Sequence, residues 1–194
     1  MAPPSTADRI LRAARDLFEG EGPAAVSMRR VAEAVGITPM AIYRHFPNRE
    51  ALLKRISDDS FNEIAHHWDA LRSRGSDLVQ RLLAIQRIYL DYALAHPHLF
   101  DHAFSSPRAD ARRFPEDFRA RRSPTLNVVH DTVVEAQRAG VLRDGDPWDI
   151  AMTLWAQSHG LVALYRAGRF SYDERAFRAF YDACLGRLLD GLRT

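Results

Sequence analysis

The 194-residue chain carries 27 lysine and arginine residues against 25 aspartate and glutamate residues, and 46% of its residues are hydrophobic. This hydrophobic fraction is sufficient for a buried core, and the length lies between one large domain and two small ones. Charged residues interrupt the apolar runs before the roughly 18 residues of a membrane span, and the first residues lack the apolar stretch of a secretory signal. We therefore expect a cytoplasmic protein without a membrane partner.

The small basic excess is concentrated near the N-terminus. Residues 1–55 hold nine Lys and Arg against six Asp and Glu, whereas the remaining residues hold 18 against 19. An excess of this size is ordinary, so it favours a nucleic-acid partner only weakly. The single cysteine, Cys184, excludes an intramolecular disulfide and is typical of a small buried apolar residue.

Apolar residues recur at helical spacing, and no alternating β-branched run predicts a strand, so we expect an all-α protein. The first helix is predicted to begin after Ser5 or Thr6 and to end at the glycines of 20–23. A second helix has Ser27 as a favourable N-cap and Gly36 as the residue that ends it.

The third predicted helix is unusually short. Thr38 is a favoured N-cap and Pro39 a favoured first helical residue, whereas Pro47 cannot continue a helix, so this helix closes near His45. Asn48 then caps a long fourth helix. Further helices are predicted at 77–95, 97–105, 124–139, 148–167 and 172–192, and the arginine-rich segment 106–123 is predicted to be a surface connection with room for one helical turn.

Two helices joined by a tight glycine-containing turn are typical of a helix-turn-helix, whose second helix can lie in the DNA major groove. Ile37, Ile42 and Phe46 satisfy the local core. The other side chains of so short a helix cannot all be buried: Met40, Ala41, Tyr43, Arg44 and His45. Outward hydroxyl and cationic groups suit phosphates and base edges. Short helix pairs also occur as plain architecture in helical bundles, and this alternative stays open.

The segment SMRRVAEAVGITPMAIYRHFPNREALL, residues 27–53, resembles the N-terminal domain of TetR-type transcriptional repressors nearly position for position. The resemblance implies a three-helix DNA-binding domain over residues 1–48 and a larger helical effector-binding and dimerisation domain over residues 49–194. It also implies a homodimer that binds a palindromic operator in double-stranded DNA and is released by a small-molecule effector.

The same resemblance assigns roles to individual positions. It implies phosphate or backbone contacts for Ser27, Thr38, Tyr43 and His45, and positions near the bases for Arg29, Pro39, Met40, Ala41 and Arg44. Arg30 starts the supporting helix beside Arg29, where it could reach the DNA backbone. Arg49 replaces the family's usual lysine, and both Arg49 and Lys54 could reach a phosphate. Pro39 and Met40 offer apolar contact rather than hydrogen bonds, so Arg29 and Arg44 are predicted to read guanine.

The C-terminal part carries a second resemblance. Trp155, His159 and Gly160 are similar to the W…H-G signature of one TetR-type ligand-binding subgroup, and HPHLFDHAF at 96–104 is similar to its short kinked helix. A largely apolar effector with one polar handle is expected, bound by Trp68, Phe100, Phe104, Trp155 and His159. The last helix implies a dimer interface through Phe177, Tyr181, Leu185 and Leu188. Intramolecular core is the alternative for this stripe, and both can hold because a helix has two sides.

No motif predicts catalysis, so we expect neither an enzyme nor a cofactor. Glu63 and His66 supply only half of the paired Glu-x-x-His motif that a di-iron bundle requires. His96, His98 and His102 could ligate a metal, but ordinary helical histidines are the commoner case. The competing function is a helical effector-binding or protein-interaction module whose helix-turn-helix is only architectural.

Overall fold

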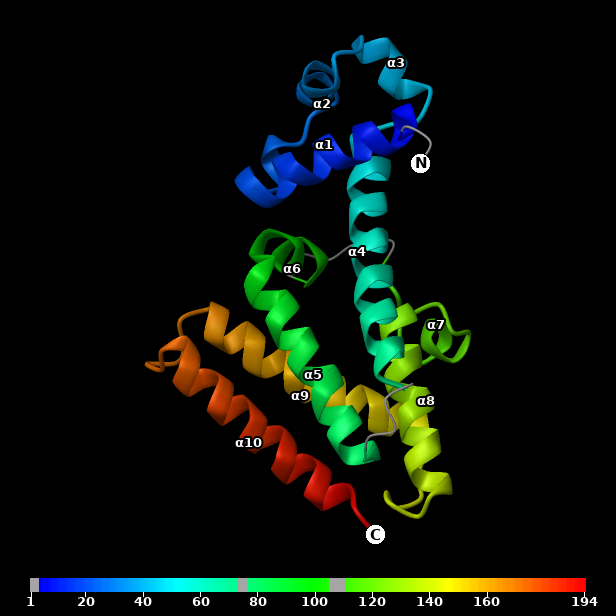
Figure 1. Cartoon of the computed structure of the whole chain (residues 1–194), viewed down its shortest axis with the longest axis vertical. Coiled ribbons are helices and arrows are strands. Elements are labelled where there is room, and N and C mark those ends of the chain that lie inside the picture. The colour runs from blue at the N-terminus through cyan, green and yellow to red at the C-terminus, as the bar shows by residue number, and fades with distance from the viewer. Residues whose placement is uncertain (1–3, 73–76, 105–110) are drawn as a thin grey trace. The chain divides into compact units, whose positions relative to one another are not determined.

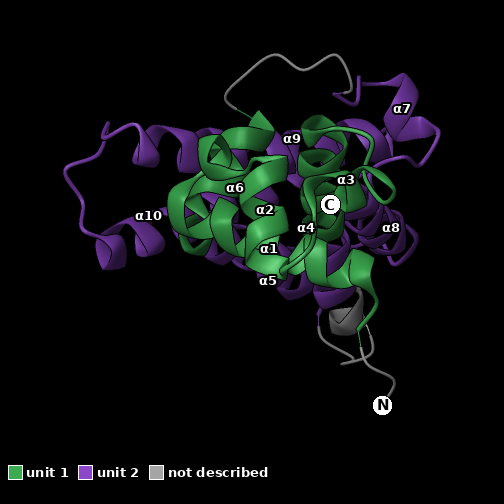
Figure 2. Ribbon diagram, turned by 90° about the horizontal axis from the view of Figure 1, so that it is seen from above, with its two compact units in different colours: residues 1–61, 94–109 green, residues 62–93, 110–194 purple. Residues whose placement is uncertain are grey.

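The computed structural model describes residues 4–72, 77–104 and 111–194, except the side chains of 69–72. Ten α-helices and one short 3-10 helix lie within these ranges, which contain no β-strand (Figure 1). The all-α prediction is therefore confirmed. The chain divides into two compact units (Figure 2), an N-terminal unit of Met1–Phe61 with Leu94–Ala109 and a C-terminal unit of Asn62–Ala93 with Asp110–Thr194.

The N-terminal unit is built from short helices and the beginning of a long one. Its elements are α1 (Thr6–Glu21), η1 (Pro23–Ala25), α2 (Met28–Val35), α3 (Pro39–Tyr43), the part of α4 (Arg49–Arg72) up to Phe61, and α6 (Pro97–Phe104). This compact unit includes α6 and more than three turns of α4, and the DNA-binding domain over residues 1–48 stays a prediction.

Side-chain caps define where these helices begin. The Ser5 hydroxyl accepts from the third N–H of α1, and the Asn48 amide oxygen accepts from the Ala51 N–H at the start of α4 (2.7 Å). α1 ends at Gly22, whose φ of 85° favours a residue without a Cβ atom. The predicted starts of α1 and α4 are confirmed, together with their physical cause.

The core of the N-terminal unit joins α1 to its neighbours. Ile10, Ala14 and Phe18 line one side of α1 and are fully buried, as are Val31 of α2 and Ile42 of α3. α1 packs against η1, α2 and α6, and α2 packs against α3. Burial of such side chains stabilises a fold by about 1.5–3 kcal/mol each, so α3 is held mainly by its single buried isoleucine.

The C-terminal unit contains the rest of α4 and most of α5 (Leu78–Ala95), followed by four further helices. They are α7 (Glu116–Arg119), α8 (Pro124–Arg138), α9 (Pro147–Arg166) and α10 (Glu174–Leu192). α8 packs against α9, and α9 packs against α10. The five helices predicted between residues 77 and 192 correspond to α5, α6, α8, α9 and α10, and their bounds differ from the observed ones by no more than two residues at either end. Of the predicted connection 106–123, residues 106–110 lie outside the described residues, and α7 forms the turn of helix in the rest.

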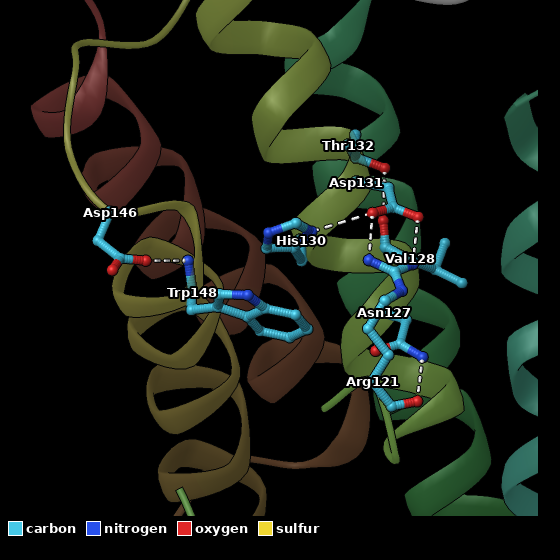
Figure 3. A network of polar contacts seen from close by, with 8 residues as sticks. All are labelled: Arg121, Asn127, Val128, His130, Asp131, Thr132, Asp146 and Trp148. Atoms are coloured by element: carbon cyan, nitrogen blue, oxygen red, sulfur yellow. Dashed lines mark hydrogen bonds and ion pairs between the residues drawn. The ribbon is translucent and has the colours of Figure 1, made fainter. Parts of the chain in front are cut away.

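A polar network fixes the turn between α7 and α8 (Figure 3). Arg121, whose φ is 58°, donates two hydrogen bonds to the Asp131 carboxylate, at 2.9 and 2.8 Å. The His130 ring lies 2.9 Å from the same carboxylate through Nδ1 and stacks on Trp148 of α9. Burial would raise the pKa of Asp131, but the hydrogen bonds from Arg121 and His130 outweigh burial and lower it. The network therefore ties α7, α8 and α9 together.

Among the helices that the structure describes, none combines the length and the apolar character needed to cross a membrane.

Candidate nucleic-acid interface

α2 and α3 form a helix-turn-helix with an abrupt turn (Figure 1). Gly36 adopts the left-handed conformation (φ 74°, ψ 37°) that ends α2, and the Ile37 N–H returns to the Ala32 carbonyl at 3.0 Å. Two residues later the Thr38 hydroxyl accepts from the Ala41 N–H at 3.3 Å, and Pro39 opens α3. The predicted turn is confirmed, and its geometry fixes the direction of α3 relative to α2.

α3 divides its side chains between anchoring and exposure. Ile42 is fully buried and Phe46 is 9% exposed, so these two residues hold the helix against the unit. Met40 is 72% exposed and Tyr43 is 50% exposed. The remaining outward residues near α3 are also exposed: Thr38, Pro39, Arg44 and His45. A short helix anchored at one position thus presents polar, cationic and apolar groups to solvent.

The predicted basic residues fall into two groups. Arg29 and Arg44 are exposed, and in the described part of the chain neither has an ion-pair partner. Arg30 instead donates to the Glu21 carboxylate (2.7 and 3.1 Å), which lowers the pKa of Glu21, and Lys54 pairs with Asp58. Arg29 and Arg44 are therefore the cations of this region that are available to a new anionic or acceptor partner.

Arg49 has an internal structural role that the sequence did not reveal. Its Nε donates to the Val26 carbonyl at 2.7 Å, and a terminal nitrogen donates to the Pro23 carbonyl at 2.5 Å. These bonds tie the first turn of α4 to the segment that leads into α2. The sequence shows that Arg49 lies at the start of a helix, but it does not show which distant carbonyl groups the side chain contacts.

Three histidines in and just before α6 lie near α1 and its C-terminal end within the N-terminal unit. His96 Nδ1 lies 3.5 Å from a Glu19 carboxylate oxygen, and His102 meets the Phe18 ring edge to face at a centroid distance of 5.3 Å. A Cβ atom at Gly22 would lie 3.3 Å from the His98 ring. Among the described residues, no group of His, Cys, Asp and Glu is arranged to hold a metal ion. These histidines therefore lie where α6 packs against α1.

The residues predicted to bind an effector fall in both units. Phe100 and Phe104 of the N-terminal unit have ring centroids 5.2 Å apart. In the C-terminal unit the Trp155 and His159 rings lie 5.5 Å apart, and Trp68 is buried. That all five residues line one pocket stays a prediction.

Sequence reasoning missed a buried polar cluster beside His159. The Ser158 hydroxyl donates to the Gln86 amide oxygen, and the Tyr181 hydroxyl donates to the Gln86 backbone carbonyl, both at 2.8 Å. Tyr89 Oη lies 3.0 Å from His159 Nδ1. Burial lowers the pKa of His159 and raises the pKa of Tyr89, so both are neutral at pH 7. The only signal in the sequence is a glutamine within the apolar run LLAIQRIYL.

Three residues of the stripe predicted at the dimer interface lie in the core of one chain, which is the alternative that the sequence left open. Phe177, Tyr181 and Leu185 are fully buried within a single chain, so they face the interior of the C-terminal unit. Leu188 is partly exposed. The dimer interface through α10 stays a prediction, because i, i+3, i+4 spacing identifies an apolar face without identifying what covers it.

Two parts of the chain match models of a family of transcriptional regulators. The family model described as bacterial regulatory proteins of the tetR family matches residues 10–56, and the model described as the tetracyclin repressor-like C-terminal domain matches residues 82–188. A nucleoid occlusion factor, SlmA, from Aliivibrio fischeri is 28% identical over 101 residues, or 50% of each chain. The present chain thus spans about half the length of this curated relative and of a second SlmA, from Marinobacter nauticus.

Solved structures share the fold over nearly the full length. A protein of unknown function from Rhodococcus sp. RHA1 is 24% identical, with a TM-score of 0.81 over 99% of this chain and 97% of that chain. A TetR-family transcriptional regulator from Pectobacterium atrosepticum is 21% identical, with a TM-score of 0.76 over 97% and 94%. With family models matching both the helix-turn-helix and more than half of the chain beyond it, this protein belongs to the TetR family of bacterial transcriptional regulators.

Proposed function

We propose that this DNA-binding regulator is a repressor that occupies a palindromic operator as a homodimer and is released by a small-molecule effector. The observation that carries the proposal is the division within α3. Ile42 is fully buried, whereas Tyr43 and Arg44 are exposed, and Arg29 of α2 is exposed as well. Because the fold does not use these outward groups, they are free to contact DNA.

The outward groups suit distinct parts of DNA. A guanidinium can donate two hydrogen bonds to the O6 and N7 atoms of guanine, so Arg29 and Arg44 are the proposed base readers. Hydroxyl and imidazole groups at phosphates fix the register of a protein without reading sequence, which suits Ser27, Thr38, Tyr43 and His45. Arg30 could reach a phosphate by exchanging its Glu21 partner. Arg49 and Lys54 are weaker candidates, because each already has a partner within α4 or its neighbours.

A homodimer would use the outward sides of α9 and α10. Leu164 of α9 is 49% exposed, Leu188 of α10 is partly exposed, and Ala179 and Ala183 of α10 are exposed. Small side chains allow two helices to approach closely across a two-fold axis. Such a dimer presents two copies of α3 to successive major grooves, so the operator would be an approximate palindrome.

Release requires that the effector favour one arrangement of the dimer. A ligand shifts an equilibrium only by its differential affinity for the two states. Trp155 and His159, with Trp68, offer aromatic surface and a neutral imidazole in the C-terminal unit. The proposed effector is therefore largely apolar with one polar group.

The proposal is tested by selecting duplexes from a random library with the full-length protein. A selected palindrome, bound with an affinity that falls as salt increases, supports a specific DNA-binding dimer. Arg44→Ala should weaken binding by about 1–3 kcal/mol and relax the preference at one position in each half-site. Arg143→Ala, which removes an exposed arginine from the C-terminal unit, is the matched control and should leave binding unchanged. If no duplex is selected, the helix-turn-helix is architectural and the protein is an interaction module.

A further inference from the structure

The first turn of α3 presents an apolar surface to solvent. Met40 is the most exposed of the large hydrophobic side chains among the described residues, at 72%. It lies between Pro39, which is exposed, and Ala41, which is partly exposed. Its neighbour Ile42 is fully buried and anchors the helix. Met40 therefore contributes almost nothing to the stability of the fold. Stability alone would favour a polar residue at so exposed a position.

Met40 also lies in the first turn of α3. It is the second residue of the helix, after Pro39. The N-terminal residues of a recognition helix contact base edges in the major groove. The Thr38 hydroxyl bonds the Ala41 N–H at 3.3 Å, which fixes the backbone on both sides of Met40. This step rests on the proposed function, because it requires that α3 bind DNA.

We propose that Met40 reads the C5-methyl group of a thymine in each half-site. Thymine is the one base that offers an apolar group in the major groove, whereas the other bases offer only hydrogen-bond donors and acceptors there. A thioether placed over guanine O6 or cytosine N4 would remove water from these atoms without replacing the hydrogen bond, which is unfavourable. Against a methyl group, the same contact buries apolar surface on both molecules.

The position of Arg44 restricts where this thymine lies. Met40 and Arg44 are four residues apart, and Arg44 continues the helical backbone with φ −72° and ψ −22°. Residues at this spacing share one face of a helix and are separated by about 6 Å along its axis. With α3 following the groove, the proposal places the thymine contacted by Met40 about two base-pair steps from the base contacted by Arg44.

The test uses a duplex selected by the full-length protein, in which each thymine is replaced in turn by deoxyuridine. This replacement removes only the methyl group and keeps the base pair. The wild-type protein should lose affinity about fourfold at one symmetric position per half-site, which corresponds to about 0.8 kcal/mol for one buried methyl group. Met40→Ala should bind the thymine duplex about as weakly as the wild type binds the deoxyuridine duplex, and should no longer distinguish the two.

Two variants complete the experiment. Met40→Leu keeps an apolar side chain and should retain the discrimination, whereas Met40→Gln should lose it. All three variants should melt at the wild-type temperature, because the side chain is exposed. Equal wild-type affinity for every deoxyuridine duplex would overturn the inference alone, as would a thymine preference that Met40→Ala retains. Failure to select any duplex would overturn the proposed function together with it.

Discussion

Replacing Arg49 by alanine should loosen the N-terminal unit rather than remove a DNA contact. The guanidinium donates to the carbonyls of Val26 at 2.7 Å and Pro23 at 2.5 Å, and the side chain is 36% exposed. A hydrogen bond from a charged donor contributes about 1.5–3 kcal/mol when it is shielded, and water replaces part of the loss at an exposed site. We therefore expect the two bonds together to contribute about 2 kcal/mol to the stability of this unit.

Hydrogen exchange of the α2 and α3 amides measures this loss directly, because these amides report opening of the N-terminal unit. Arg55→Ala, which removes an exposed Asp59 ion pair one turn and a half further along α4, is the matched control and should change exchange little. The salt dependence of DNA binding supplies the second measurement. Each lost phosphate contact reduces the slope of log K against log salt by about 0.9. Unchanged exchange together with a reduced slope would refute the structural role and restore a phosphate contact.

Four further variants test other parts of the molecule. Tyr43→Phe should weaken binding to all DNA sequences about equally in a gel shift, and a loss confined to one sequence would contradict a phosphate role. Ala183→Glu, on the exposed side of α10, should give monomers by light scattering, whereas Leu185→Ala should lower the free energy of unfolding by about 2–5 kcal/mol because it leaves a cavity; a stable Ala183→Glu dimer would exclude this face. His159 has a pKa lowered by burial from its ordinary 6.5, so the unfolded chain takes up its proton first, and stability should fall as the pH drops below about 6.5. Urea unfolding at several pH values should show a smaller decline for His159→Gln, and an unchanged slope would contradict the shift.

The sequence predicted the helices near the DNA-binding surface because local rules decide them. Ser5, Thr38 and Asn48 cap the helices through side-chain oxygens, and Gly36 adopts the left-handed conformation that ends α2. Each of these effects depends on a few adjacent residues. The outward direction of Tyr43 also followed from counting how many side chains a short helix can bury, and its 50% exposure confirms that prediction.

The features that the sequence did not reveal depend on residues far apart in the chain. Gln86 and Ser158 meet across 72 positions, and Arg49 bonds carbonyls more than 20 positions away. Periodicity marked Leu185 as apolar, but only the packing of α10 shows that its own chain covers it. Neighbouring residues in the sequence determine which face of a helix is apolar. They do not determine which other helix packs against that face.

The separation of anchoring from exposure within α3 has a consequence for how this protein can change over time. Ile42 carries the packing, while Met40, Arg44 and the other outward residues contribute little to folding. Substitutions at the outward positions therefore escape the stability threshold that eliminates most mutations. A lineage carrying this helix can therefore change the groups that it presents to solvent in single steps, with a folded protein at every intermediate.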